Sequence, residues 1–188
     1  FAPSHRLEPG SPIKLITSGN FRLSHLIVPQ IEALRILRRS GYEVELTVIG
    51  PIADKSLDWT VKEPGVRYLG KVSREEIPEH LSEADIFVFS MLNAACPNSV
   101  VEAVGAGLPV VGFASGSLPE ICRFNQDLLV PMPDRLIHAD DEADGEALAA
   151  KIVEAIAEYP RFKQRALDHR STYSMESSVE KYRESLRI

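Results

Sequence analysis

The stretch from Ala84 to Phe113 constrains the fold of this chain more than any other part of its 188 residues. Its sequence, ADIFVFSMLNAACPNSVVEAVGAGLPVVGF, holds a short apolar run, a loop, an amphipathic segment after Pro97 and a second apolar run after two glycines. Proline favours the first position of a helix, and short apolar runs bounded by glycine are typical of buried strands. We therefore predict a strand over 86–89, a helix opening at Pro97 and a strand over 110–113, which together form one parallel β-α-β unit.

The start of that helix is predicted to bind an anion. The backbone amides of Asn98, Ser99 and Val100 would lack partners inside the helix, and the helix dipole adds positive potential at the same end. Glu102 follows one turn later on roughly the same face. A carboxylate beside a bound phosphate would repel it, so we expect Glu102 to accept hydrogen bonds from neighbouring hydroxyl groups. A phosphate with a diol beside it describes a nucleotide or nucleotide sugar; the alternative is an ordinary crossover helix with a solvated glutamate.

Strands and helices alternate along the rest of the chain. Further strands are predicted over 13–18, 44–49, 66–69 and 128–130, and helices from Pro29 to Gly41 and over 74–81, 98–106, 146–158 and parts of 161–188. This alternation predicts an α/β fold, a Rossmann-like doubly wound parallel sheet of about six strands. Such sheets bind ligands beyond the carboxyl ends of their strands. The residues that follow those ends are Gly19, Gly50, Gly70 and Ser90.

The composition is typical of one soluble globular domain, with 44% hydrophobic and 26% charged residues. The net charge of −6 argues against a nucleic-acid partner, because phosphate backbones require a concentrated basic surface. The two cysteines, Cys96 and Cys122, have neither metal-binding nor redox spacing, and the acidic run from His138 to Asp144 is interpreted as a helix cap rather than a metal site. Without an apolar run long enough for a bilayer or an export signal, the expected location is the cytoplasm.

The same region carries a family resemblance. FVFSMLNAACPNSVVEAVGAGLPVVGFASGSLPEI resembles the donor-site signature of the retaining GT-B glycosyltransferases of the glycosyl transferases group 1 type, and further matches extend over nearly the whole chain. The matching signature positions are Ser90, Glu102, Gly107, Pro109, Val110 and Val111. The resemblance implies that this chain is the C-terminal, donor-binding half of a GT-B fold. It also implies a UDP-, GDP- or ADP-sugar as donor, transfer of a hexose to an acceptor hydroxyl, and no metal or other cofactor.

Three positions depart from the family pattern. The first glutamate of the signature, which approaches the transferred sugar, is replaced by Ala94, and the arginine and lysine that neutralise the departing diphosphate are replaced by Asn20 and His25. Arg22 lies between the last two and is predicted to supply the missing charge, since a guanidinium engages phosphate with two hydrogen bonds. Arg22 and His25 are therefore the predicted catalytic residues, although a solvated arginine and a structural histidine are the alternatives.

The resemblance also assigns the remaining contacts to the donor. Glu102 is expected to hold the ribose, and the segment from Gly70 to Val72 the base. The residues predicted to bind the nucleotide sugar are Gly19, Asn20, Gly70, Val72, Cys96, Pro97, Asn98, Ser99, Val100 and Glu102. The turn Ser115-Gly116-Ser117 is expected to be structural rather than a ligand contact.

The resemblance divides the chain into three parts: an interdomain linker over 1–12, the donor domain over 13–170 and a C-terminal helix over 171–188. The last would pack toward an N-terminal, acceptor-binding domain, which is absent, so the fragment alone is expected to be inactive. Peripheral membrane association of the full-length protein is a further expectation. Two alternatives stay open: a non-catalytic nucleotide-sugar-binding module or degenerate subunit, which Ala94 favours, and a sugar-nucleotide epimerase of similar build.

Overall fold

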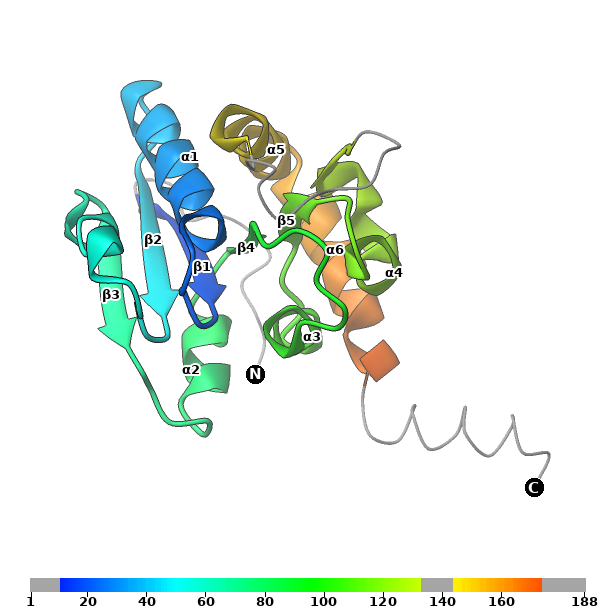
Figure 1. Ribbon diagram of the computed structural model, residues 1–188. Helices are drawn as coiled ribbons and strands as arrows, with labels where there is room; N and C mark the ends of the chain where they lie inside the picture. Colours follow the sequence, from blue (N-terminus) through cyan, green and yellow to red (C-terminus); the bar gives the residue numbers. More distant parts are fainter. Residues whose placement is uncertain (1–10, 133–143, 174–188) are drawn as a thin grey trace.

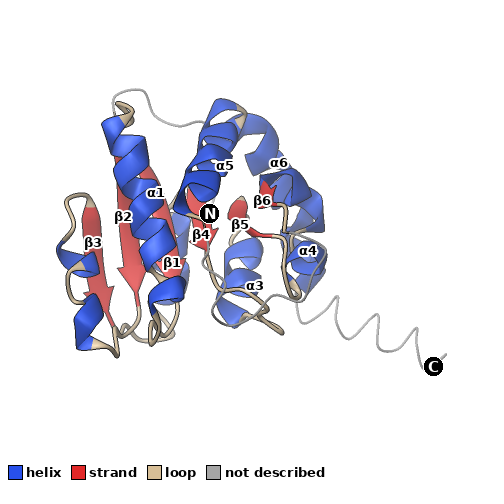
Figure 2. Cartoon of the chain, turned by 45° about the horizontal axis from the view of Figure 1, so that its top comes forward, coloured by secondary structure: helices blue, strands red, loops and turns tan. Residues whose placement is uncertain are grey.

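The computed structural model describes residues 11–132 and 144–173, which form a six-stranded parallel sheet with helices on both faces (Figures 1 and 2). The strand order is β3-β2-β1-β4-β5-β6. The strands are β1 (Ile13–Ser18), β2 (Val44–Ile49), β3 (Val66–Gly70), β4 (Ile86–Phe89), β5 (Val110–Phe113) and β6 (Leu129–Val130). The α-helices are α1 (Val28–Arg39), α2 (Ile77–Ser82), α3 (Asn98–Gly105), α4 (Leu118–Ile121), α5 (Gly145–Ala157) and α6 (Tyr159–His169). Short 3-10 helices are η1 (Ser24–Leu26), η2 (Lys55–Leu57), η3 (Thr60–Lys62), η4 (Arg123–Leu128) and η5 (Arg170–Tyr173). This is the predicted doubly wound fold.

Each face of the sheet carries its own apolar core, because side chains alternate between the faces along a strand. Leu15 of β1 and Val88 of β4 pack with α1, α5 and α6 on one face. Ile16 and Phe87 point the other way and pack with α2, α3 and α4. Figure 2 shows α1 and α5 side by side over the first of these faces.

Most predicted boundaries are confirmed, and the errors fall where short-range chemistry competes with periodicity. The helix predicted over 74–81 begins only at Ile77, because Pro78 sits in the first turn and the preceding residues form a turn in which Glu76 accepts from the Ser73 amide at 2.8 Å. The strand predicted over 128–130 lacks Leu128, which ends the η4 helix. The predictions for 1–10, 133–143 and 174–188 lie outside the described residues.

Asp144 caps α5 as predicted, accepting from the amides of Glu146 and Ala147 at 2.8 and 3.1 Å. At the opposite, amino edge of the sheet, Asp85 accepts from the Lys14 amide at 2.8 Å and faces the buried Lys163. Burial raises the pKa of Asp85 and lowers the pKa of Lys163, while their mutual attraction opposes both shifts. This polar group lies away from the predicted donor site.

Candidate functional site

The sheet order reverses between β1 and β4, so the loops that follow these two strands meet at one edge. The β1–β4 ladder contains only the pairs Leu15–Ile86 and Ile16–Phe87, whereas β1 stays paired with β2 as far as Ser18. The two strands therefore separate toward their carboxyl ends. Six of the twelve predicted site residues lie in the loops that follow these two strands, and four more lie on α3, which comes directly after the second loop (Figure 1).

The loop after β1 is held by its backbone and presents polar side chains. Phe21 is buried, and its amide and carbonyl bond to Pro51 and Ala53 of the loop after β2 at 3.0 Å each. Asn20 and Arg22 are exposed, and no side-chain partner is found for Arg22 within the described residues. His25 lies in the η1 helix; its side chain lies outside what the structure describes. The anchored backbone thus fixes where Arg22 is displayed.

The start of α3 differs from the prediction by one residue. Pro97 has an extended ψ of 109° and is the N-cap, so the helix begins at Asn98. Because the carbonyl of Pro97 accepts from the Val100 amide at 3.0 Å, the prediction of a free amide at Val100 is wrong. The amides of Asn98 and Ser99 have no hydrogen-bond partner among the described residues, which leaves two donors at this helix end.

Glu102 lies on α3 one turn beyond these two amides and is half-buried. Its carboxylate makes neither a hydrogen bond nor an ion pair with any described residue. A partly buried carboxylate normally acquires a partner, because removal from water costs free energy that a hydrogen bond or cation must offset. An unpartnered Glu102 beside free amide donors therefore fits a site that is completed by a ligand.

Ala94 is 5% exposed and belongs to the apolar cluster that includes Phe89 and Leu118. Its carbonyl accepts from the amide and the hydroxyl of Ser117, at 2.9 and 3.1 Å. Ser115 accepts from the Asn93 amide at 3.2 Å. These contacts bind the loop after β4 to the loop after β5, so the Ser-Gly-Ser turn has a structural role; that it makes no ligand contact stays a prediction.

A glutamate is expected to destabilise the chain at position 94. Ala94→Glu adds volume and charge to an apolar contact, which we expect to cost about 2 kcal/mol and to lower Tm by roughly 4–8 °C. Thermal unfolding by circular dichroism measures this effect. Ala95→Glu, at the exposed neighbouring position, is the control and should unfold within about 1 °C of the wild type. Equal Tm values for the two variants would show that position 94 is not packed as described.

The predicted base-binding segment follows β3. Gly70 has a φ of +64°, and its carbonyl accepts from the Gly50 amide at 2.7 Å. Val72 is half-buried against the cluster on the α3 face. Tyr68, whose ring lies close to Gly70, is 39% exposed. Contact of Val72 with a base stays a prediction.

The two cysteines differ in environment. Cys122 is buried, and burial raises the pKa of its thiol to about 12, so it remains a protonated core residue. Cys96 is exposed in the loop before Pro97. Within 11–132 and 144–173, no group of three His, Cys, Asp or Glu side chains is arranged to hold a metal ion, and the run from His138 lies mostly outside these ranges.

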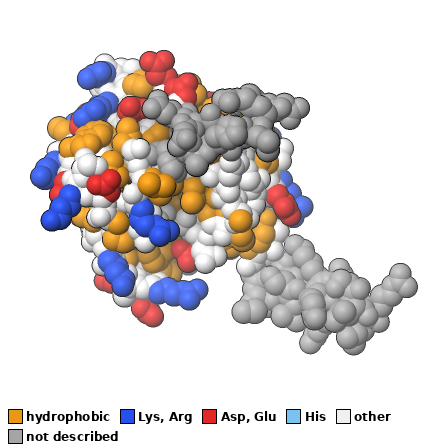
Figure 3. All heavy atoms as spheres, in the orientation of Figure 1, with side chains coloured by type: hydrophobic (Ala, Val, Ile, Leu, Met, Phe, Trp, Pro, Cys, Tyr) orange, Lys and Arg blue, Asp and Glu red, His pale blue; other side chains and the backbone are white. Residues whose placement is uncertain are grey.

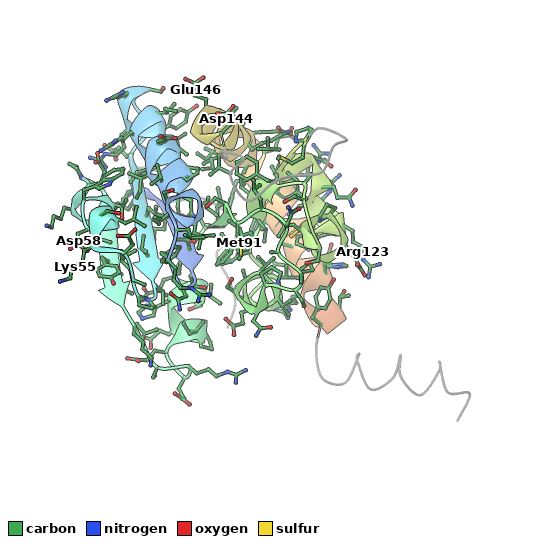
Figure 4. The ribbon with its side chains drawn as sticks, viewed as in Figure 1. Lys55, Asp58, Met91, Arg123, Asp144 and Glu146 are labelled. Carbon is green, nitrogen blue, oxygen red and sulfur yellow. The ribbon has the colours of Figure 1, made fainter. Side chains whose placement is uncertain are left out.

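Two features of this site are not evident from the sequence. The buried Gln30 of α1 donates to Ser90 at the end of β4, and the exposed Met91 follows it. Figure 4 shows Met91 between α1 and α3, in the middle of the molecule. The hydrogen bond from Gln30 to Ser90 had one signal in the sequence, a glutamine among the apolar positions of α1.

The sheet order and the opening between β1 and β4 identify the class of the domain. The chain is an α/β Rossmann-like domain similar to one half of a GT-B glycosyltransferase. Residues 14–158 match the family described as "Glycosyl transferases group 1", and the chain belongs to that family.

Relatives with this domain are named glycosyltransferases. The chain is 32% identical over 156 residues to the amylovoran biosynthesis glycosyltransferase AmsK of Erwinia amylovora, a match that covers 74% of this chain and 35% of the relative. It is 25% identical over 169 residues to the putative colanic acid biosynthesis glycosyltransferase WcaL of Escherichia coli, which covers 81% of this chain and 38% of the relative. The chain thus spans little more than a third of the length of these relatives.

Solved structures share the fold. The pneumococcal O-GlcNAc transferase GtfA, in complex with UDP and GlcNAc, superposes with a TM-score of 0.72 at 17% identity, covering 94% of this chain and 35% of that one. WaaG, a glycosyltransferase involved in lipopolysaccharide biosynthesis, gives a TM-score of 0.65 at 20% identity, covering 85% and 42%. Within the described part of the chain, no helix combines the length and apolar character needed to cross a bilayer.

Proposed function

We propose that this chain is the donor-binding domain of a retaining glycosyltransferase and binds a nucleoside-diphospho-sugar at the carboxyl edge of its sheet. The observation that carries the proposal is the unpartnered Glu102 carboxylate one turn from the free amides of Asn98 and Ser99. In this arrangement the diphosphate accepts from the two amides and from Arg22, while Glu102 accepts from the ribose hydroxyls. The base lies along Gly70 to Val72.

Transfer itself is proposed for the longer protein. The relatives extend well beyond the matched region, so the acceptor would bind to parts of the protein outside this chain. The role of this domain is to hold the donor and to stabilise the departing diphosphate, which is the main electrostatic demand of the reaction. Arg22 and the helix end meet that demand without a metal ion. The isolated chain is accordingly expected to bind donor weakly and to transfer nothing.

Calorimetric titration of the chain with UDP-, GDP- and ADP-glucose tests the proposal. We expect one base to be preferred, with a Kd between about 10 µM and 1 mM, a range typical of substrate sites. The matching nucleoside diphosphate should compete, inorganic phosphate and free glucose should not, and EDTA should leave the affinity unchanged. Absence of binding by all three nucleotide sugars would contradict the proposal.

A non-catalytic donor-binding module is the second candidate, because Ala94 is packed where the family resemblance expects a glutamate. Both candidates predict binding, and they differ in turnover. The longer natural protein, incubated with the preferred donor and membrane or polysaccharide extracts, separates them: transfer of labelled sugar excludes the non-catalytic candidate, whereas donor binding without transfer favours it.

A further inference from the structure

Three hydrogen bonds link Gln30, Leu26 and Ser90 at the open carboxyl end of the sheet, and the two that involve Ser90 cross the opening. The Gln30 Nε2 group donates to the Leu26 carbonyl at 2.9 Å and to the Ser90 hydroxyl at 3.0 Å. The Ser90 hydroxyl in turn donates to the same Leu26 carbonyl at 2.9 Å. The three groups therefore form a closed ring of hydrogen bonds, and its members come from η1, α1 and the end of β4.

The ring lies beyond the last paired residues of β1 and β4. The ladder between these strands ends at Ile16 and Phe87, three residues before Ser90. Leu26 belongs to the loop that carries Arg22, and Ser90 begins the loop that leads into α3. Gln30 thus helps to connect the loop after β1 and the loop after β4, the two walls of the proposed donor site. The connection lies beyond the point where β1 and β4 are paired.

The orientation of the amide follows from its partners. A carbonyl oxygen only accepts, so the NH2 group of Gln30, and not its oxygen, faces Leu26. The side chain is 3% exposed, and its Oε1 atom has no hydrogen-bond partner among the described residues. A leucine or methionine at this apolar helix position would avoid that unsatisfied acceptor, so the core alone does not explain a glutamine here.

We propose that Gln30 is a positioning residue that latches the loop after β1 to the loop after β4, and that this latch sets the affinity for the nucleotide sugar. The second half of this inference rests on the proposed function. Because the diphosphate would contact Arg22 on one loop and the amides of Asn98 and Ser99 beyond the other, its binding depends on how the two walls are held relative to each other. A ligand gains affinity when the groups that contact it are held in place beforehand.

Gln30→Met tests the latch, because methionine keeps the length of the side chain and removes its donors. Amide hydrogen exchange of the 188-residue chain is followed over residues 20–27 and 90–97. We expect exchange in both segments to rise about tenfold together, as loss of a buried hydrogen bond implies. Ser90→Ala removes both bonds that cross the opening, so it should raise exchange in the same two segments at least as much. The double variant should add little to the effect of Ser90→Ala, because both substitutions break one ring.

Asn125→Leu is the matched control. Asn125 is also a buried amide, its Nδ2 donates to the Phe162 carbonyl at 3.2 Å, and its Oδ1 has no partner among the described residues. Its substitution removes one buried amide hydrogen bond outside the two loops, so exchange over 20–27 and 90–97 should stay at the wild-type level even if Tm falls.

Titration with the preferred nucleotide sugar gives the second readout. A Gln30→Met variant that loosens both segments and binds about tenfold more weakly than the Asn125→Leu control supports the inference. Unchanged exchange, loosening of one segment alone, or unchanged affinity in the loosened variant overturns it. If the wild type binds no nucleotide sugar, the proposed function and the affinity role both fail, and exchange still decides whether the latch exists.

Discussion

Replacing Glu102 with alanine is expected to weaken binding of the nucleotide sugar by about 10- to 100-fold while the fold persists. A hydrogen bond to a charged group contributes about 1.5–3 kcal/mol, and 1.4 kcal/mol corresponds to a tenfold change in Kd. Because the Glu102 carboxylate has no hydrogen-bond or ion-pair partner among the described residues, its removal breaks no polar interaction within them, and Tm should change by less than about 2 °C. Calorimetry and thermal unfolding of the same samples measure both quantities.

The ribose assignment is tested separately from the loss of charge. A 2′,3′-dideoxy form of the donor should bind the wild type as weakly as Glu102→Ala binds the natural donor, and the variant should not distinguish the two ligands. Glu120→Ala, which removes an exposed carboxylate from α4, is the control and should bind normally. If the variant still prefers the ribose form by the wild-type factor, Glu102 does not contact the ribose.

Gly50→Ala is expected to destabilise the chain by about 3–5 kcal/mol, a larger loss of stability than the one expected for Ala94→Glu. Gly50 has a φ of +118°, and a Cβ atom there would lie 1.8 Å from the carbonyl oxygen of Gly19. Since both atoms belong to the backbone, no side-chain rotation relieves the overlap, and the ends of β1 and β2 must separate. Urea unfolding measures this effect, and the urea concentration at which half of the chain is unfolded should fall well below the wild-type value.

Two other glycines separate the steric overlap at Gly50 from the cost of its positive φ. Gly41 has a φ of +87° but open space around it, so Gly41→Ala measures the cost of positive φ alone, expected at about 1–2 kcal/mol. Gly105 in α3 has neither problem, and Gly105→Ala should stabilise the chain by up to about 1 kcal/mol through helix propensity. A Gly50→Ala variant that unfolds with the midpoint of Gly41→Ala would refute the close approach of the two loops.

Five of the six strands were predictable because each is a short, largely apolar run that ends near a glycine or serine; β6 is followed by Pro131 instead. The helix starts were less predictable. The first residue of α2 and of α3 depends on whether the nearby proline lies inside the first turn, as Pro78 does, or caps the helix, as Pro97 does. Hydrophobic periodicity does not reveal which of the two occurs.

The sequence identified the polar residues of the site, but it did not predict the contacts between distant segments. Glu102, Asn98 and Ser99 were identified from one segment, since a helix brings residues four apart to one face. Two of the three bonds in the ring of Gln30, Leu26 and Ser90 join residues 60 or more positions apart, so the ring depends on the register of whole elements. The packing of Ala94 likewise follows from tertiary contacts, so the sequence alone did not show that this position is buried in an apolar cluster.

The face seen in Figure 3 carries basic and acidic side chains interspersed with apolar ones. This mixture agrees with the acidic net charge, and the described residues form no extended basic surface on this face, so the proposed role of Arg22 in binding a diphosphate is that of a local cation. Two large apolar side chains are exposed in the loops after β1 and β4: Leu23 and Met91. Figure 4 shows Met91 between α1 and α3.

Mapping of the bound nucleotide on the backbone tests the central claim most directly. In an ¹⁵N-labelled chain titrated with the preferred nucleotide sugar, the largest amide shift changes should fall on Asn98 and Ser99, with further changes from Gly19 to Arg22 and at Gly70. Changes gathered instead around the cavity at the amino edge of the sheet, which is lined by Lys14, Thr47 and His80, would contradict the account.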